Sequence, residues 1–259
     1  LLRGLGVFDR VDIVSAPIPG TDHTGQPAVL ARREPENGRP TVLLYAHHDV
    51  QPPGDDALWQ SPPFEPTVRG DRLYGRGAAD DKAGVIAHVA AIRALIDTVG
   101  DPDVGIVVFV EGEEEFGSRS FRALLDAHRE TLAADVIVVA DSDNWTTEIP
   151  SLTIGLRGNA AFTLTISTLA HASHSGMLGG AAPDAMLAAV RLLATLHDED
   201  GSVAVAGLTS HEQEVPADDL ERFRHEAGLL EGVSPIGRGA LLHRVWAQPA
   251  ITVTGIDAP

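Results

Sequence analysis

The chain has 259 residues, of which 44% are hydrophobic and 22% charged, and its formal net charge is −18. This composition is typical of a soluble globular protein with one large or two moderate domains, and no apolar run is long enough to span a membrane. The absence of cysteine excludes disulfides, thiol nucleophiles and thiolate metal sites, and it is consistent with a cytoplasmic location. The negative charge disfavours binding to nucleic acid or anionic membranes.

The chain begins with LLRGLGVF, which is typical of the middle of a helix, and it ends soon after a predicted strand. We therefore expect a fragment that is cut at both ends, from which targeting signals would be missing. Short apolar runs bounded by turn-forming residues predict strands at 11–14, 28–33 and 41–45.

The third of these strands ends in AHHDVQP, residues 46–52. In an extended chain His47 and Asp49 point to the same face. This arrangement suits a metal-bound imidazole whose second ring nitrogen donates to a carboxylate. An isolated His-x-Asp is more often a pair of polar residues without a ligand. Open α/β sheets, however, place their sites at the carboxyl ends of strands, so the location favours a site.

A second motif, GRGAADDKAG at residues 75–84, follows a proline-rich loop and connects a short predicted strand to a predicted helix that begins near Asp81. Its glycines allow a sharp turn. Lys82 is the only lysine among 19 basic residues, which suggests that its compact ammonium is needed there. The alternative is an ordinary capped helix start, in which aspartates favour the positive end of the helix dipole.

Carboxylates also follow the next two apolar strands, predicted at 105–110 and 135–140. The first strand leads into EGEEEFGS at 111–118, where Glu114 and Glu115 could divide the binding of a metal and the polarisation of a water. An acidic run of this kind is more often a solvated loop. A predicted helix at 116–130 separates it from the second strand, which ends in DSDNW at 141–145.

Strands and helices therefore alternate along the first part of the chain, which predicts an α/β fold with a mostly parallel central sheet flanked by helices. Four positions at strand ends or strand-to-helix junctions carry side chains that can bind metal: His47, Asp80, Glu115 and Asp141. Because these positions meet at one edge of such a sheet, the pattern predicts a metal site formed by imidazole and carboxylate groups.

The pattern changes after Pro150, where strands are predicted at 151–158, 161–168 and 250–254 and helices at 183–196 and 218–227. This mixture predicts a second domain of the α+β type. We expect the domain boundary between residues 156 and 157.

The four motifs AHHDVQP, GRGAADDKAG, EGEEEFGS and ADSDNW occur in this order, and the family resemblance that they carry covers nearly the whole chain. Together they resemble the dinuclear zinc exopeptidase and deacylase family, which includes carnosinase-like dipeptidases, glutamate carboxypeptidase, aminoacylase, acetylornithine deacetylase and succinyl-diaminopimelate desuccinylase. The HDVQP and GRGxxDDK forms most resemble the carnosinase-like dipeptidases. The resemblance implies a catalytic metal-binding domain at 1–156 and a lid and dimerisation domain at 157–259, both incomplete.

The resemblance also implies two divalent ions, zinc in the first place, with manganese or cobalt as substitutes. The implied metal ligands are His47, Asp80 as the bridge between the ions, Glu115 and Asp141. Asp143 is the rival of Asp141 for its role. Asp49 would hold the imidazole of His47, Glu114 would be the general base, and the peptide bond between Asp80 and Asp81 would be cis.

The sequence departs from the family pattern at two places. His174 in HSG, residues 174–176, resembles a lid histidine that stabilises the oxyanion or the substrate carboxylate, often in the active site of a dimer partner. Ala172 and Ser173 precede it where the family usually has Asp-Leu. The family's last histidine ligand has no counterpart after His243, so the fragment is expected to hold an incomplete second metal site.

The implied function is a metal-dependent hydrolase that cleaves dipeptides or similar small peptides with a metal-bridged water, as a homodimer formed through the lid. One alternative is an N-acyl amino acid deacylase of the same family. Another is a non-catalytic fragment or homologue that acts through dimer contacts. A dinucleotide-binding protein is disfavoured, because Asp80 stands where the third glycine of that fingerprint belongs.

Overall fold

The computed structural model describes residues 1–258, and the chain divides into two compact units, the first of which is Leu1–Leu152. The second unit begins at Thr153. Within residues 1–258, no helix combines the length and the apolar character that crossing a membrane requires.

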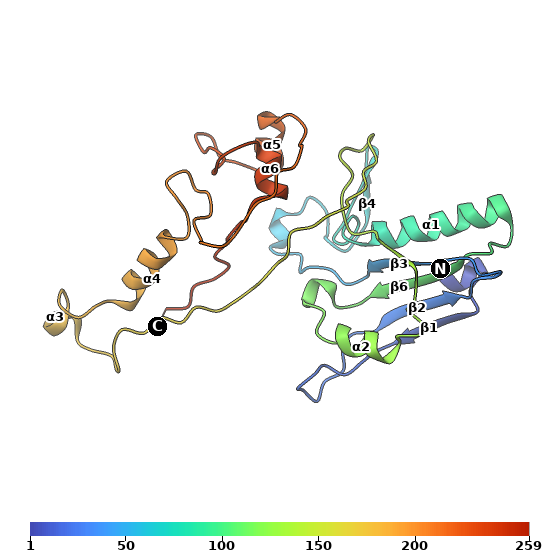
Figure 1. Cartoon of the computed structure of the whole chain (residues 1–259), viewed down its shortest axis with the longest axis horizontal. Helices are drawn as coiled ribbons and strands as arrows, with labels where there is room; N and C mark the ends of the chain where they lie inside the picture. Colours follow the sequence, from blue (N-terminus) through green and yellow to red (C-terminus); the bar gives the residue numbers. More distant parts are fainter. Residues whose placement is uncertain (259) are drawn as a thin grey trace. The chain divides into compact units, whose positions relative to one another are not determined.

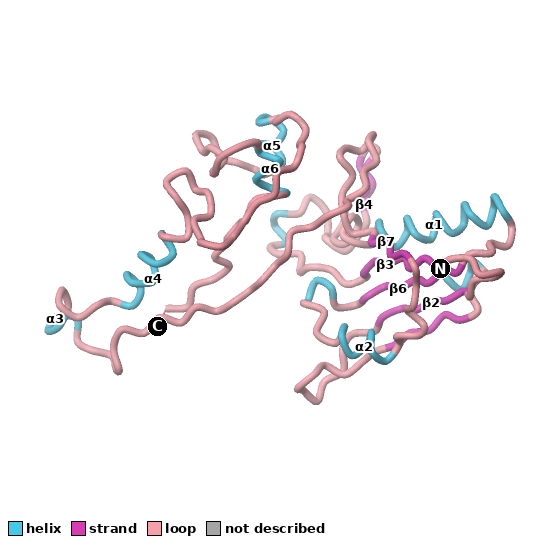
Figure 2. Tube along the Cα trace, viewed as in Figure 1, coloured by secondary structure: helices cyan, strands magenta, loops and turns pink. Residues whose placement is uncertain are grey.

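The first unit is organised around a five-stranded sheet in the order β1-β2-β6-β3-β7 (Figures 1 and 2). β3 pairs in parallel with β6 and with β7, whereas β2 pairs antiparallel with β1 and with β6. Four strands therefore run in one direction and β2 runs in the other, which confirms a mostly parallel sheet. The strands are β1 (Arg10–Val14), β2 (Ala28–Arg33), β3 (Thr41–His47), β6 (Gly105–Glu111) and β7 (Val136–Val139).

Two hydrophobic clusters cover the two faces of this sheet. On one face, Val89 and Ile92 of helix α1 (Lys82–Val99) pack with alternate residues of β6, from Ile106 to Val110. On the other face, Leu124 of helix α2 (Phe121–Ala127) packs with Phe109. Every residue of β6 is buried, as expected for a central strand with side chains alternating between two covered faces. The parallel pairing of β3 with β6 places His47 beside Glu111 at the ends of both strands.

Short elements complete the first unit. They are the 3₁₀ turns η1 (Leu2–Leu5), η2 (Asp56–Leu58) and η3 (Glu114–Phe116), and the hairpin strands β4 (Thr67–Arg69) and β5 (Arg72–Tyr74). The helix predicted at 116–130 is shorter than expected and is preceded by η3. The physical reason is that Gly117 and Ser118 have φ values of 80° and 47°, which a continuous right-handed helix does not allow.

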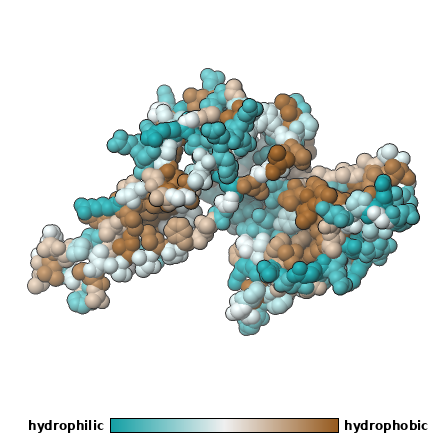
Figure 3. All heavy atoms as spheres, viewed as in Figure 1, coloured by the Kyte–Doolittle hydropathy of each residue, from teal (hydrophilic) through white to brown (hydrophobic). Residues whose placement is uncertain are grey.

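The second unit contains four helices among the described residues: α3 (Ser175–Leu178), α4 (Ala185–Ala194), α5 (Leu220–Glu226) and α6 (Leu241–Trp246). The strands predicted at 151–158, 161–168 and 250–254 are not formed; within residues 153–258 only an isolated bridge between His197 and Val203 is present. A strand needs a neighbour to accept its backbone hydrogen bonds, and an alternating pattern shows only which face is apolar. Ile154 is 92% exposed and Phe162 82% exposed, and apolar side chains occur on the surface in Figure 3.

Candidate metal centre

The carboxyl ends of the three parallel strands carry the candidate site. β3 ends at His47, and Glu114 and Glu115 follow β6 in η3. Asp141 lies two residues after the end of β7. Asp80 lies just before α1 and is joined to Asp81 by a cis peptide bond, as the resemblance implied. The ends of parallel strands meet at one edge of the sheet, so segments far apart in the chain are brought together.

The imidazole of His47 is at the centre of this group and has no exposed surface. Its Nε2 lies 3.0 Å from Oδ1 of Asp80 and 3.9 Å from Oδ1 of Asp141. Oε2 of Glu114 is also 3.9 Å from the same nitrogen. One atom each of His47, Asp80 and Asp141 lie within 4.8 Å of one another, close enough for a single metal ion to contact all three.

The other ring nitrogen of His47 faces Asp49. Its Nδ1 lies 3.3 Å from Oδ1 of Asp49, and the Asp49 carboxylate also accepts hydrogen bonds from the backbone N–H groups of Glu114 and Glu115, at 3.2 and 3.0 Å. One carboxylate therefore contacts both the imidazole and the acidic loop. The contact with the ring follows from the His-x-Asp spacing, but the contact with the loop has no signal in the sequence.

Two of the candidate metal ligands, Glu115 and Asp143, lie outside the three-residue cluster. The carboxylate of Glu115 accepts a hydrogen bond from Nε2 of Gln51 at 2.8 Å, and the side chain of Gln51 also donates to the Glu115 carbonyl at 3.2 Å. Of the two rival aspartates, Asp141 belongs to the cluster formed among residues 1–258 and Asp143 does not. Sequence reasoning gave no role to Gln51, although it stands in the AHHDVQP motif, which was the signal that could have identified it.

Burial and the neighbouring charges shift the pKa values of three residues of the site. Burial by itself would lower the pKa of His47, but the carboxylates of Asp141 and Asp49 and the hydrogen bond to Asp80 outweigh it, so the pKa is raised. Burial raises the pKa of Glu114, and the negative charge of Asp141 adds to that effect against the opposing influence of His47. The pKa of Asp141 is raised by burial and by the nearby carboxylates of Asp81 and Asp80, against the opposing influence of His47. The carboxylates therefore repel one another.

This environment fits a divalent cation. Imidazole nitrogen and carboxylate oxygen are donors for zinc and for other first-row divalent ions. A bound cation would neutralise the mutual repulsion that raises the pKa values of Glu114 and Asp141. Glu111, beside His47 in register, is buried as well, and its Oε1 has no hydrogen-bond partner among the described residues. The site therefore has excess negative charge that a cation would compensate.

The acidic loop is held by a residue that sequence reasoning treated as part of a solvated run. Glu113 is 4% exposed, and its carboxylate accepts hydrogen bonds from the backbone of Gln26 at 3.1 Å and from the backbone and hydroxyl of Ser120, at 2.9 and 2.5 Å. Gly112 beside it is equally constrained, since a Cβ there would lie 2.4 Å from the carbonyl oxygen of Pro27. The loop is therefore anchored rather than free.

Lys82 and His174, both singled out in the sequence, have local partners. Nζ of Lys82 donates to the carbonyl oxygen of His48 at 3.0 Å, so its ammonium holds the chain just after β3. His174, in the second unit, precedes α3, and its Nδ1 accepts a hydrogen bond from the backbone N–H of Gly176 at 3.0 Å. In the neutral ring the proton is then on Nε2.

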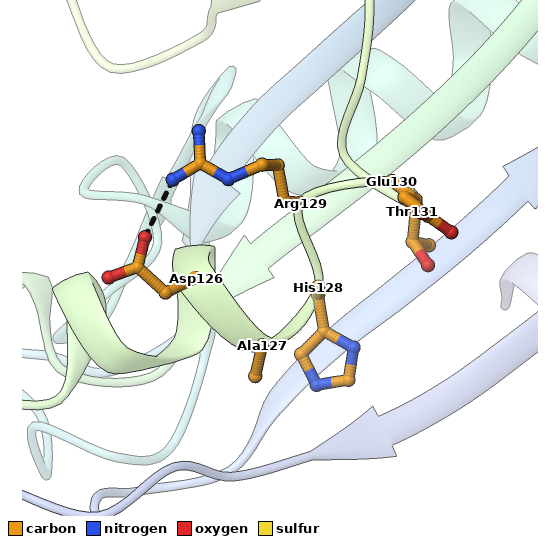
Figure 4. Close-up of a pocket in the computed structure, with 6 residues that line it drawn as sticks. All are labelled: Asp126, Ala127, His128, Arg129, Glu130 and Thr131. Atoms are coloured by element: carbon orange, nitrogen blue, oxygen red, sulfur yellow. Dashed lines mark hydrogen bonds and ion pairs between the residues drawn. The ribbon is translucent and has the colours of Figure 1, made fainter.

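A pocket elsewhere on the first unit is lined by residues 126–131, where Figure 4 shows the ion pair between Asp126 and Arg129. The carbonyl of Thr131 accepts a hydrogen bond from Arg32, which pairs with Val107 near the start of β6. This pocket thus lies at the opposite end of the sheet from His47, and we assign it no role in the site.

The model of peptidase family M20/M25/M40 matches residues 43–235. The chain is 41% identical to a cysteinylglycine-S-conjugate dipeptidase of Corynebacterium striatum, over 92% of this chain and 54% of the relative. It is 31% identical to a β-Ala-His dipeptidase of Rattus norvegicus, over 99% of this chain and 55% of the relative. The crystal structure of human carnosine dipeptidase 1 is similar, with a TM-score of 0.68 and 28% identity over 100% of this chain and 58% of that one. The chain thus spans about half the length of the curated relatives it matches.

Proposed function

Because this chain belongs to peptidase family M20/M25/M40, we propose that the protein is a metal-dependent dipeptidase that hydrolyses the amide bond of dipeptides or similarly small peptides. The observation that carries the proposal is the convergence of His47, Asp80 and Asp141 at the carboxyl edge of the sheet, with Glu114 beside them. The similar proteins named above are dipeptidases by description, which supports a dipeptide as substrate.

We assign metal binding to the residues of the candidate centre. His47 and Asp141 would hold a first ion, Glu115 a second, and Asp80 would contact both. The donor set favours zinc, and manganese or cobalt suits the same groups. Bound there, two ions would supply a water of lowered pKa and a positive charge for the developing oxyanion.

The residues of the chain then perform the proton transfers. Glu114 accepts a proton from the attacking water, whose oxygen forms the new bond to the scissile carbonyl carbon. The carbon–nitrogen bond breaks, and Glu114 delivers the proton to the leaving amine. The raised pKa of Glu114, caused first by burial, suits a group that both accepts and returns a proton. Asp49 keeps Glu114 in place through its hydrogen bond to the Glu114 backbone.

We further propose that His174 donates from Nε2 to the oxyanion or to the substrate carboxylate. The hydrogen bond from Gly176 to Nδ1 supports this role, because it leaves the proton on Nε2. A homodimer formed through the second unit is the assembly we propose. Helix α4 supports it, since Leu187 and Val190 are 50% and 52% exposed. The absence of cysteine supports a cytoplasmic location.

The proposal is tested by measuring metal content and hydrolysis together. The intact protein is expressed with zinc, its metal is counted by plasma mass spectrometry, and a panel of dipeptides and N-acyl amino acids is assayed before and after chelation. We expect about two ions per chain, dipeptide hydrolysis, and loss of activity on chelation with recovery when zinc is returned. If the protein hydrolyses N-acyl amino acids in preference to dipeptides, its function is that of a deacylase and not of a dipeptidase. A folded protein without metal or activity would overturn the proposal.

A further inference from the structure

We infer that Asp81 and Gly84, at the start of α1, are positioning residues for the candidate metal centre. They do not contact the proposed metal, but they hold the three segments that carry His47, Asp80 and Asp141 at a fixed spacing. This inference rests on the proposed metal-binding function and adds two residues to it that no sequence motif assigned to the chemistry.

Asp81 is 2% exposed, and both of its carboxylate oxygens are used by backbone donors. Oδ2 accepts a hydrogen bond from the backbone N–H of His47 at 3.1 Å, and Oδ1 accepts one from the backbone N–H of Gly84 at 3.0 Å. The side chain therefore connects the last residue of β3 to the first turn of α1. A buried carboxylate oxygen that lost either donor would be left without a hydrogen-bond partner, so both contacts are costly to break.

Gly84 allows a close approach that any side chain would block. A Cβ at this position would lie 2.1 Å from the carbonyl oxygen of Ala140 and 2.3 Å from Oδ1 of Asp81. Ala140 is the residue before Asp141, so the distance between α1 and the end of β7 determines where the Asp141 carboxylate lies. The first obstacle is backbone rather than a flexible side chain, and a methyl group would therefore push the two segments apart.

A third contact shows that the same helix is tied to the middle strand. The carbonyl oxygen of Tyr45 accepts hydrogen bonds from the backbone N–H of Ala140 at 3.0 Å and from Nε2 of His88 at 2.8 Å. His88 lies one turn after Gly84 on α1 and is 5% exposed. The first two turns of α1 therefore contact the ends of both β3 and β7. Asp80 immediately precedes Asp81, the N-cap residue of this helix.

Spacing of this kind matters because zinc binds imidazole nitrogen and carboxylate oxygen at about 2.0–2.2 Å, so ligands displaced by a few tenths of an ångström no longer reach the ion together. Groups that orient metal ligands typically change metal affinity by about 10–100-fold when they are replaced. The competing explanation is that Asp81 only caps the helix, since its bond to Gly84 is an ordinary N-cap.

The Asp81→Ser substitution separates these two explanations. A serine hydroxyl can still cap α1 by accepting from the backbone of Gly84, but a single oxygen cannot also reach the backbone of His47. Asp184→Ser is the matched control, because Asp184 caps α4 through one bond, from the backbone N–H of Leu187 at 2.7 Å, and lies in the second unit. Gly84→Ala tests the close approach independently.

The measurements are the zinc dissociation constant, by competition with a chelator, and the absorption spectrum of the cobalt-substituted intact protein, with circular dichroism as a check of folding. We expect Asp81→Ser and Gly84→Ala to weaken zinc binding about 10–100-fold and to change the cobalt spectrum, while Asp184→Ser changes neither. Tight binding and an unchanged spectrum in a folded Asp81→Ser variant would overturn this inference alone. A parent protein without metal would overturn the proposed function as well.

Discussion

Oδ1 of Asp49 accepts a hydrogen bond from the backbone N–H of Glu114 at 3.2 Å, which holds the acidic loop after β6 against the chain that follows β3. The same oxygen lies 3.3 Å from Nδ1 of His47. The proposed base and the proposed metal ligand are therefore placed by one carboxylate, although they come from different strands.

Replacement of Asp49 is expected to affect metal binding and turnover together. In Asp49→Asn the amide NH₂ group would face a backbone N–H, so one of the hydrogen bonds from the backbone of Glu114 and Glu115 is lost. Nδ1 of His47 loses the carboxylate that it faces and keeps its hydrogen bond to the carbonyl oxygen of residue 49, at 3.2 Å. We expect zinc affinity and kcat to fall about 10–100-fold each. Asp55→Asn is the matched control, because Asp55 also accepts a backbone hydrogen bond, from Ala57, but is exposed. If Asp49→Asn and Asp55→Asn had the same zinc affinity and the same kcat, this role of Asp49 would be refuted.

Replacement of Glu114 should separate chemistry from metal binding. The Glu114→Gln side chain has almost the same shape but cannot accept the proton of the attacking water, so we expect kcat to fall about 10²–10⁴-fold with the metal content unchanged. The measurement is steady-state turnover together with plasma mass spectrometry on the intact protein. Glu115→Gln is the comparison, and there we expect metal to be lost. Undiminished turnover in Glu114→Gln would exclude it as the base.

His174 is expected to act on the transition state and not on the metal. We expect His174→Ala to lower kcat by about 10²–10³-fold, with unchanged zinc content and a smaller effect on KM. His171 provides a control from the same loop, since it is also exposed and its Nδ1 donates to the carbonyl oxygen of Ala172 at 3.1 Å. If His171→Ala and His174→Ala lowered kcat by the same factor, the cause would be a general disturbance of the loop and not the loss of the His174 imidazole.

The buried carboxylate of Glu113 predicts a dependence of stability on pH. Burial raises its pKa, but the hydrogen bonds from Ser120 and Gln26 outweigh burial, so the pKa in the folded protein is lowered. A lowered folded-state pKa means that the stabilisation is present above the unfolded value, about 4.3, and is lost as the pH falls through the folded value.

We therefore expect Glu113→Gln to reduce the free energy of unfolding by about 1–3 kcal/mol at neutral pH. The difference from the parent protein should narrow as the pH falls from the ordinary glutamate pKa through the lower folded-state pKa, because the parent side chain becomes protonated over that range. Urea unfolding followed by circular dichroism measures both conditions. The exposed Glu65, replaced by glutamine, is the control. A difference that stays constant with pH would show that charge is not involved.

The local patterns of the sequence were sufficient to predict the parallel strands of the first unit. The apolar runs at 41–45, 105–110 and 135–140 became the parallel strands β3, β6 and β7. A continuous apolar run is typical of a strand buried on both faces, which holds for β6, whereas all four residues of β7 are exposed. The polar residues at the ends of these strands were recognisable as candidate ligands for a second reason. The carboxyl ends of parallel strands lie at the same edge of a sheet. The family was identifiable from the four motifs and their order.

Only the tertiary structure decided which side chains meet. The sequence offered Asp141 and Asp143 as rivals, and three-dimensional geometry brought Asp141 to His47. It also showed that the carboxylates of Asp81 and Glu113 are buried and satisfied by backbone groups distant in the chain. The strands expected in the second unit were not formed, because alternation describes a segment alone while a sheet requires a partner. Periodicity is a local property of the chain, whereas burial and hydrogen-bond partners depend on segments that only folding brings together.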